Sequence, residues 1–101
     1  MSVYAIRFAE GVEQDLKGLT AFRRRVILDA IEAQLQAEPA TPTRNRKRLV
    51  NLVPPWTAEP PIWELRLGDY RVFYDVSEPD TTVFVRAIRL KPPGKTTEEI
   101  L

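Results

Sequence analysis

Apolar and polar residues alternate with a period of two on both sides of a Gly-Asp pair, over residues 63–76. This alternation predicts two half-buried strands, and Gly68-Asp69 between them suits a two-residue type II′ hairpin turn. If Leu67 faces Tyr70, the register predicts one apolar face. The other opposed pairs on that face are Leu65–Val72 and Trp63–Tyr74.

The second face of the predicted hairpin carries charge. In the same register Glu64 lies opposite Phe73, and Arg66 lies directly opposite Arg71. Like charges in a directly opposed cross-strand pair are unfavourable, so the two guanidinium groups require an anion between or beside them. A carboxylate such as Glu64 can serve, and so can a phosphate. We therefore expect the functional site on this hairpin.

The N-terminal part of the chain predicts a strand and two helices. Residues 3–8 alternate as a strand does, and the apolar positions that follow have helical spacing up to a stop at Gly18. Thr20 can cap a second helix, which Pro39 ends. We expect one apolar stripe of this helix to pack on a sheet. The stripe consists of Phe22, Val26, Ile27, Ala30, Ile31 and Leu35.

Residues 39–62 predict a long irregular connection, because they hold six of the nine prolines. A last strand is expected over residues 83–91, before Pro92-Pro93-Gly94 and a helical turn at the C-terminus. Strict alternation places Phe84, Ile88 and Leu90 on one face of that strand. It places Val83, Val85, Ala87, Arg89 and Lys91 on the other.

These elements predict an α+β fold. The expected order is β-α-α-β-β-β, with a small, mainly antiparallel sheet, two N-terminal helices on one face and a short C-terminal helical turn. At 101 residues, we expect a single domain over residues 1–101.

Composition excludes several kinds of chemistry. The chain has no cysteine and no histidine, which excludes His/Cys zinc sites and histidine-based nucleophile systems, and we expect no metal and no cofactor. We find no apolar run that could span a membrane and no secretory signal, and the lack of cysteine fits a cytoplasmic protein. The net charge is only +1, so local clusters matter more than the total.

Three segments together resemble the RelE/ParE toxins of bacterial type II toxin–antitoxin modules, over nearly the whole chain. The first is the strand–helix–helix start with Asp15-Leu16-Lys17. The second is the hairpin with Leu65-Arg66 and Tyr70-Arg71-Val72-Phe73-Tyr74, and the third is the strand over residues 83–91 followed by Thr-Glu-Glu-Ile-Leu. Members of the RelE branch cleave mRNA, often in the ribosomal A site. Members of the ParE branch keep the fold and inhibit DNA gyrase.

The resemblance implies roles for particular residues. Arg71 matches the arginine that stabilises the scissile phosphate, and Lys91 the basic group that contacts phosphate or protonates the leaving 5′-oxygen. Arg66 and Arg89 are expected to add phosphate contacts. The segment before the hairpin resembles one that follows the RNA, with Arg44, Arg46, Lys47 and Arg48. Structural alternatives remain open: a solvated loop over residues 44–48, and ion bridges for the hairpin arginines.

The chain also departs from the ribonuclease pattern. Ile62 and Glu64 stand where the nucleases have lysines, and neither tyrosine nor histidine follows Tyr74. Glu64 is therefore the one candidate for the general base. These departures favour the alternative of a ParE-like gyrase inhibitor, and a third possibility is a catalytically inert co-repressor that binds only the antitoxin.

The favoured hypothesis is a ribosome-dependent mRNA endoribonuclease that inhibits translation. Its partners are mRNA, the ribosomal A site and a cognate antitoxin whose complex with the toxin binds operator DNA, and no membrane is involved.

Overall fold

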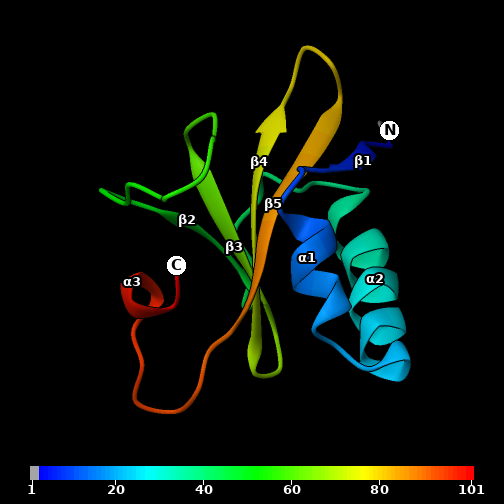
Figure 1. The fold of residues 1–101 in the computed structure, drawn as a ribbon. Helices are drawn as coiled ribbons and strands as arrows, with labels where there is room; N and C mark the ends of the chain where they lie inside the picture. The colour runs from blue at the N-terminus through cyan, green and yellow to red at the C-terminus, as the bar shows by residue number, and fades with distance from the viewer. Residues whose placement is uncertain (1–2) are drawn as a thin grey trace.

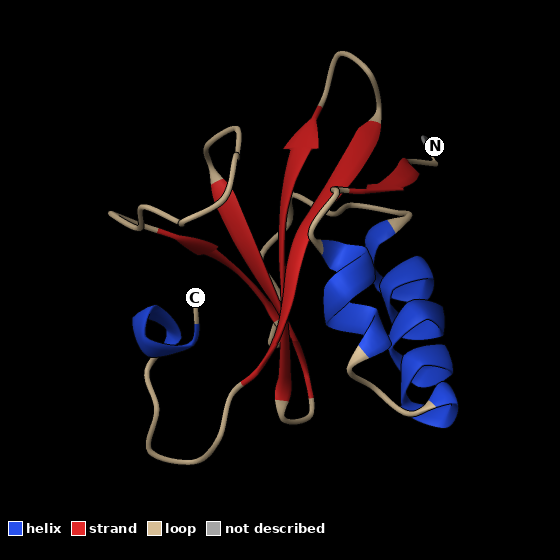
Figure 2. Cartoon of the chain, viewed as in Figure 1, coloured by secondary structure: helices blue, strands red, loops and turns tan. Residues whose placement is uncertain are grey.

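A computed structural model describes residues 3–101 as one mixed five-stranded sheet with three helices (Figures 1 and 2). The strands lie side by side in the order β1-β5-β4-β3-β2, in which β1 is parallel to β5 and the other pairs are antiparallel. The elements are β1 (Ala5–Phe8), α1 (Val12–Lys17), α2 (Ala21–Leu35), β2 (Arg46–Leu49), β3 (Ile62–Leu67), β4 (Tyr70–Ser77), β5 (Thr82–Leu90) and α3 (Thr97–Ile100). The predicted α+β class and the order of the predicted elements are confirmed, and β2 is one strand more than the sequence predicted.

The hairpin of β3 and β4 has the predicted register. Leu67 pairs with Tyr70, and Arg66 pairs with Arg71. Gly68 adopts a φ of 60°, as the first central residue of a type II′ turn requires, and Asp69 is not among the residues with positive φ. The alternating pattern and the turn residues therefore determine this register together.

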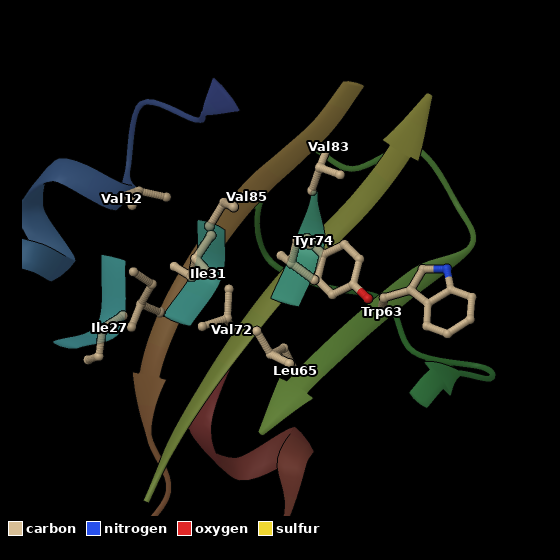
Figure 3. Close-up of a cluster of buried hydrophobic side chains, with 11 residues drawn as sticks. Val12, Ile27, Ile31, Trp63, Leu65, Val72, Tyr74, Val83 and Val85 are labelled. Carbon is tan, nitrogen blue, oxygen red and sulfur yellow. The ribbon is translucent and has the colours of Figure 1, made fainter. Parts of the chain in front are cut away.

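The two faces of the sheet have different partners (Figure 1). The helices α1 and α2 cover one face, here called the helix-pair face, and α3 lies against the other, here called the α3 face. The core lies on the helix-pair face, where valines of α1 and the strands meet isoleucines of α2 (Figure 3). Its fully buried members include Val12, Ile31, Leu65, Val72, Tyr74, Val83 and Val85.

The predicted apolar stripe of α2 is only partly correct. Ile27, Ile31 and Leu35 are buried as expected, whereas Phe22 is 79% exposed and Val26 is 49% exposed. Phe22 and Ile31 are nine positions apart, which places them about 180° apart around a helix of 3.6 residues per turn. The two residues therefore cannot face the same sheet.

The proline-rich connection is not wholly irregular, because it contains the edge strand β2. This strand pairs antiparallel with β3, from Arg46 opposite Leu65 to Leu49 opposite Ile62. Its sequence, Arg-Lys-Arg-Leu, has no apolar alternation, so the pattern of its own residues does not predict it. Backbone pairing with β3 therefore defines this strand.

A bulge in β5 makes the predicted faces of that strand wrong. Phe73 pairs with Ala87 but Tyr74 pairs with Val85, which leaves Arg86 as the extra residue. The alternation is therefore inverted at Arg86. As a result Val85 and Ile88 both belong to the core on the helix-pair face.

Candidate functional site

Three arginines stand in one row across the α3 face. Arg66 on β3 pairs with Arg71 on β4, which in turn pairs with Arg89 on β5. Each of them neighbours a core residue in its strand, and successive side chains of a strand point to opposite faces, so all three project to the α3 face. This arginine row concentrates positive charge on the three adjacent strands β3, β4 and β5, near the end of the sheet that carries the β3–β4 turn.

Within residues 3–101, the central arginine of the row is buried without an acidic partner. Arg71 is 8% exposed, and its Nη1 donates to the carbonyls of Gly68 at 2.8 Å and Tyr70 at 2.9 Å. Its Nε has no hydrogen-bond partner, and no carboxylate of residues 3–101 forms an ion pair with it. A buried, unpaired guanidinium is costly, and an anion that reaches it gains a strong charge-assisted bond.

Arg89 is held at the edge of the row by two groups. Its Nη1 donates to Asp15 Oδ1 at 2.7 Å, while Asp15 Oδ2 accepts the backbone N–H of Ile88 at 3.0 Å. The guanidinium of Arg89 also lies 5.4 Å from the ring centroid of Trp56. Because α1 carries Asp15, this helix fixes both the strand and its arginine.

Trp56 forms the apolar wall beside the row. One neighbour of its ring is Phe73, at 5.4 Å between centroids, and another is the Arg89 guanidinium. Its Nε1 is buried without a hydrogen-bond partner within residues 3–101. Trp56 therefore packs between Phe73 and the Arg89 guanidinium.

Glu64 lies on the same face, two residues before Arg66 along β3. Its side chain is buried, at 4% exposure. Its Oε2 accepts a hydrogen bond from Thr97 Oγ1 at 2.9 Å, and its Oε1 lies 3.8 Å from Lys47 Nζ. Glu64 is also diagonal to Arg71, because it pairs with Phe73. The C-terminal helix therefore contacts the acidic group of the site directly.

The remaining predicted residues divide between the two faces. Lys47 pairs with Glu64 and projects to the α3 face, whereas Arg48 pairs with Trp63 and projects to the helix-pair face. Lys91 directly follows β5, and its N–H donates to the carbonyl of Asp69 at 2.7 Å beside the hairpin turn. Arg44 is exposed ahead of β2.

Arg46 lies apart from the arginine row and completes the end of α2. Its Nη1 donates to the carbonyls of Gln34 at 2.8 Å and Glu38 at 2.9 Å, where a helix leaves carbonyls without partners. The side chain is 9% exposed. Arg46 thus ties β2 to α2.

Arg46→Met is expected to lower the free energy of unfolding by about 2–3 kcal/mol, because bonds from a charged donor to helix-end carbonyls are lost. Urea denaturation measures this loss. Arg48→Met is the matched control, since Arg48 lies two residues along the same strand and is exposed. An equal loss in both variants would contradict the capping role.

Tyr74 has a structural role in the core. Tyr74 is fully buried and its hydroxyl donates to the carbonyl of Pro39 at 2.6 Å. Burial raises the pKa of Tyr74 far above its usual value. Through this hydrogen bond Tyr74 links the sheet to the segment that follows α2.

Sequence reasoning identified the opposed Arg66–Arg71 pair but not the groups that hold the row. Asp15, Trp56 and Thr97 each reach the site from a different element, far away in the sequence. Periodicity within one element contains no signal for such contacts.

None of the helices in residues 3–101 is long and apolar enough to cross a membrane.

The fold and the arginine row define a small α+β protein with a basic sheet face. A family model described as the ParE toxin of the type II toxin–antitoxin system parDE matches residues 6–90. The chain therefore belongs to this family, within the RelE/ParE superfamily, and is a toxin of a type II toxin–antitoxin module. A search of curated protein sequences finds no significant match.

Solved structures of related toxins share the fold. The RelBE2 toxin–antitoxin complex of Mycobacterium tuberculosis gives a TM-score of 0.71 at 22% identity, over 90% of this chain and 94% of that chain. The archaeal RelE–RelB complex of Pyrococcus horikoshii gives 0.68 at 25% identity, over 93% and 99%. The isolated RelE toxin of E. coli gives 0.65 at 18% identity, over 91% and 88%.

Proposed function

We propose that this toxin is a metal-independent mRNA endoribonuclease that acts on the ribosome. The observation that carries the proposal is the arginine row of Arg66, Arg71 and Arg89 across three adjacent strands. Guanidinium groups match phosphate oxygens in geometry and charge. A row of this kind, with a buried and unpaired centre, suits an RNA backbone better than a neutral protein surface.

The proposed reaction is attack of a ribose 2′-oxygen on the adjacent phosphorus. The P–O5′ bond breaks, leaving a 2′,3′-cyclic phosphate on one fragment and a 5′-hydroxyl on the other. Arg71 stabilises the charge that develops on the phosphate, and Arg66 and Arg89 hold its oxygens. Glu64 accepts the proton of the 2′-hydroxyl, and Lys91 donates one to the leaving 5′-oxygen.

Access of RNA to Glu64 requires Thr97 to release it. The helix α3 has only four residues and none of them is buried, so its displacement costs little packing energy. The ribosome supplies the alignment of the message, and Lys47 and Arg44 attract its phosphates from the segment around β2.

We also propose that the chain binds a cognate antitoxin. Two of the similar structures described above are toxin–antitoxin complexes. The antitoxin silences the toxin and takes it to operator DNA.

The second candidate function is inhibition of DNA gyrase without hydrolysis. Two observations favour it: the match to the ParE toxin model and the engagement of Glu64 by Thr97 and Lys47. In that case the basic face binds a protein or DNA surface and no bond is cleaved.

Expression of the toxin in growing bacteria separates these functions. The nuclease hypothesis predicts cut messages and loss of polysomes, with no accumulation of gyrase–DNA cleavage complexes. Gyrase–DNA complexes with intact polysomes would contradict it and support the second function. Growth at the normal rate would support a chain that only binds its antitoxin.

A further inference from the structure

A cavity of about 910 Å³ lies beside the arginine row. Its walls are the end of β1 with the connection to α1, the middle of β5, and Trp56 and Thr57 from the connection between β2 and β3. Because Arg89 belongs both to its lining and to the row, the cavity continues the row beyond β5, on the side of β1 and α1 (Figure 1). Its volume is within the range of about 300–1,000 Å³ that is usual for small-molecule sites.

Two of the arginines that line the cavity are supported by aromatic rings. The guanidinium carbon of Arg86 lies 4.9 Å from the centroid of the Phe84 ring, and that of Arg89 lies 5.4 Å from the centroid of the Trp56 ring. The two arginine side chains keep 15% and 31% of their surface exposed. A guanidinium supported on one side can stack with a further planar group on its other side.

Carboxylates neutralise both of these arginines. Asp75 forms an ion pair with Arg86 at 2.7 Å, and Asp15 forms one with Arg89 at 2.7 Å. The cavity therefore differs from the centre of the row, where Arg71 has no acidic partner within residues 3–101. A phosphate gains more from charge at Arg71 than inside the cavity.

Arg7 and Glu10 complete the lining with one charge of each sign. Both side chains are exposed, and neither forms an ion pair within residues 3–101. Arg7 lies opposite Phe84 in the pairing of β1 with β5, so the two project to the same face. The cavity thus combines ring and guanidinium surfaces with a donor and an acceptor side chain. This combination suits a nucleobase, which is planar and uncharged and carries donors and acceptors on its edges.

We propose that this cavity binds the base of the nucleotide on the 3′ side of the cut. Glu64, which accepts the proton of the 2′-hydroxyl in the proposed reaction, is on β3, whereas Lys91, which protonates the leaving 5′-oxygen, follows β5. The message therefore crosses the row from β3 to β5, and the nucleotide that carries the 5′-oxygen lies beside the cavity. The inference rests on the proposed nuclease function and adds a base-binding site to it.

An abasic nucleotide at this position of the message tests the site. The cut is first mapped on an intact message, and single-turnover cleavage on purified translating ribosomes is then compared with a message that lacks only the base 3′ to the cut. The ribosome also contacts this base, so the informative quantity is the ratio of the two rates, compared between toxin variants. We expect this ratio to be at least about fivefold larger for the unchanged toxin than for variants of the cavity, because stacking on one base contributes such a factor or more.

Two variants each remove one group of the cavity. Phe84→Leu keeps apolar volume but removes the ring that supports Arg86, and Arg7→Gln removes an exposed charge without disturbing the core. Both are expected to cut the intact message more slowly and to lose most of the discrimination against the abasic one. Phe22→Leu and Arg25→Gln are the matched controls, because both residues are exposed on α2, across the sheet from the cavity. The controls should keep the full ratio, and circular dichroism verifies that each variant is folded.

The other outcomes contradict the inference in distinguishable ways. An equal effect of base removal on the unchanged toxin and on folded Phe84→Leu and Arg7→Gln would show that only the ribosome reads the base, and would leave the nuclease function intact. Failure of the unchanged toxin to cut the intact message would contradict the proposed function itself.

A free nucleotide is the remaining source of the same chemistry. Adenosine and guanosine 5′-monophosphate are titrated into the toxin without ribosomes, and tryptophan fluorescence is measured. Saturable quenching that Phe84→Leu abolishes, together with an abasic message that all variants cut at the intact rate, would assign the cavity to a free nucleotide and overturn its assignment to the message.

Discussion

Arg71→Ala is expected to lower the rate of message cleavage by at least about 100-fold, the usual cost of losing one preorganised donor to the charge of a transition state. Arg71 is the centre of the arginine row and is buried without an acidic partner in residues 3–101, so no carboxylate there competes with the phosphate for its guanidinium. The rate is measured by single-turnover cleavage of a defined message on purified ribosomes.

Arg44→Ala provides the control for charge alone. It removes the same charge from an exposed position ahead of β2, and we expect a reduction of less than tenfold that disappears at high salt. Circular dichroism must show that Arg71→Ala is folded. Normal cleavage by folded Arg71→Ala would exclude the row as the site of chemistry.

Arg86→Met is expected to lower the free energy of unfolding by about 3–5 kcal/mol, the range for breaking a buried ion pair from one side. Arg86 Nε donates to Asp75 Oδ2 at 2.7 Å and its Nη2 donates to Asp75 Oδ1 at 3.1 Å. Asp75 is 1% exposed, so its charge would keep only the N–H of Glu59, at 3.2 Å. Urea denaturation measures the change.

The double variant Asp75→Asn, Arg86→Met tests the reason for this loss. If the cost comes from an uncompensated buried charge, neutralising Asp75 should restore part of the stability that Arg86→Met removes. A double variant less stable than Arg86→Met alone would show that packing, and not charge, dominates. The pair is not part of the arginine row: Asp75 lies opposite Phe84, four residues along β4 from Arg71.

The hairpin could be predicted from the sequence because two local signals agree. Alternation fixes which residues share a face, and Gly68-Asp69 fixes where the chain turns. Together they determine the opposition of Arg66 and Arg71 without any knowledge of the rest of the fold.

The position of Arg89 beside Arg71 could not be predicted from the sequence. The pairing of Arg89 with Arg71 depends on the register between β4 and β5, and the bulge at Arg86 changes that register. No turn signal marks the bulge, since its cause is the fit between two whole strands.

The contacts that support the site were also beyond prediction. Asp15 reaches Arg89 across 74 positions of the sequence, and Thr97 reaches Glu64 across 33. Such contacts follow from the packing of helices on the sheet, which periodicity determines only coarsely. Arg46 is an example. The sequence shows only that it belongs to a basic run, whereas the fold shows that its guanidinium bonds carbonyls at the end of α2 and just beyond it.

The central claim is that the arginine row binds the phosphate of a message and promotes its cleavage. The most direct measurement is the chemistry of the RNA ends after incubation of the toxin with a defined message on purified translating ribosomes. We predict fragments ending in a 2′,3′-cyclic phosphate, paired with fragments that begin with a 5′-hydroxyl. A message that stays intact under these conditions, with the toxin folded, would contradict the claim.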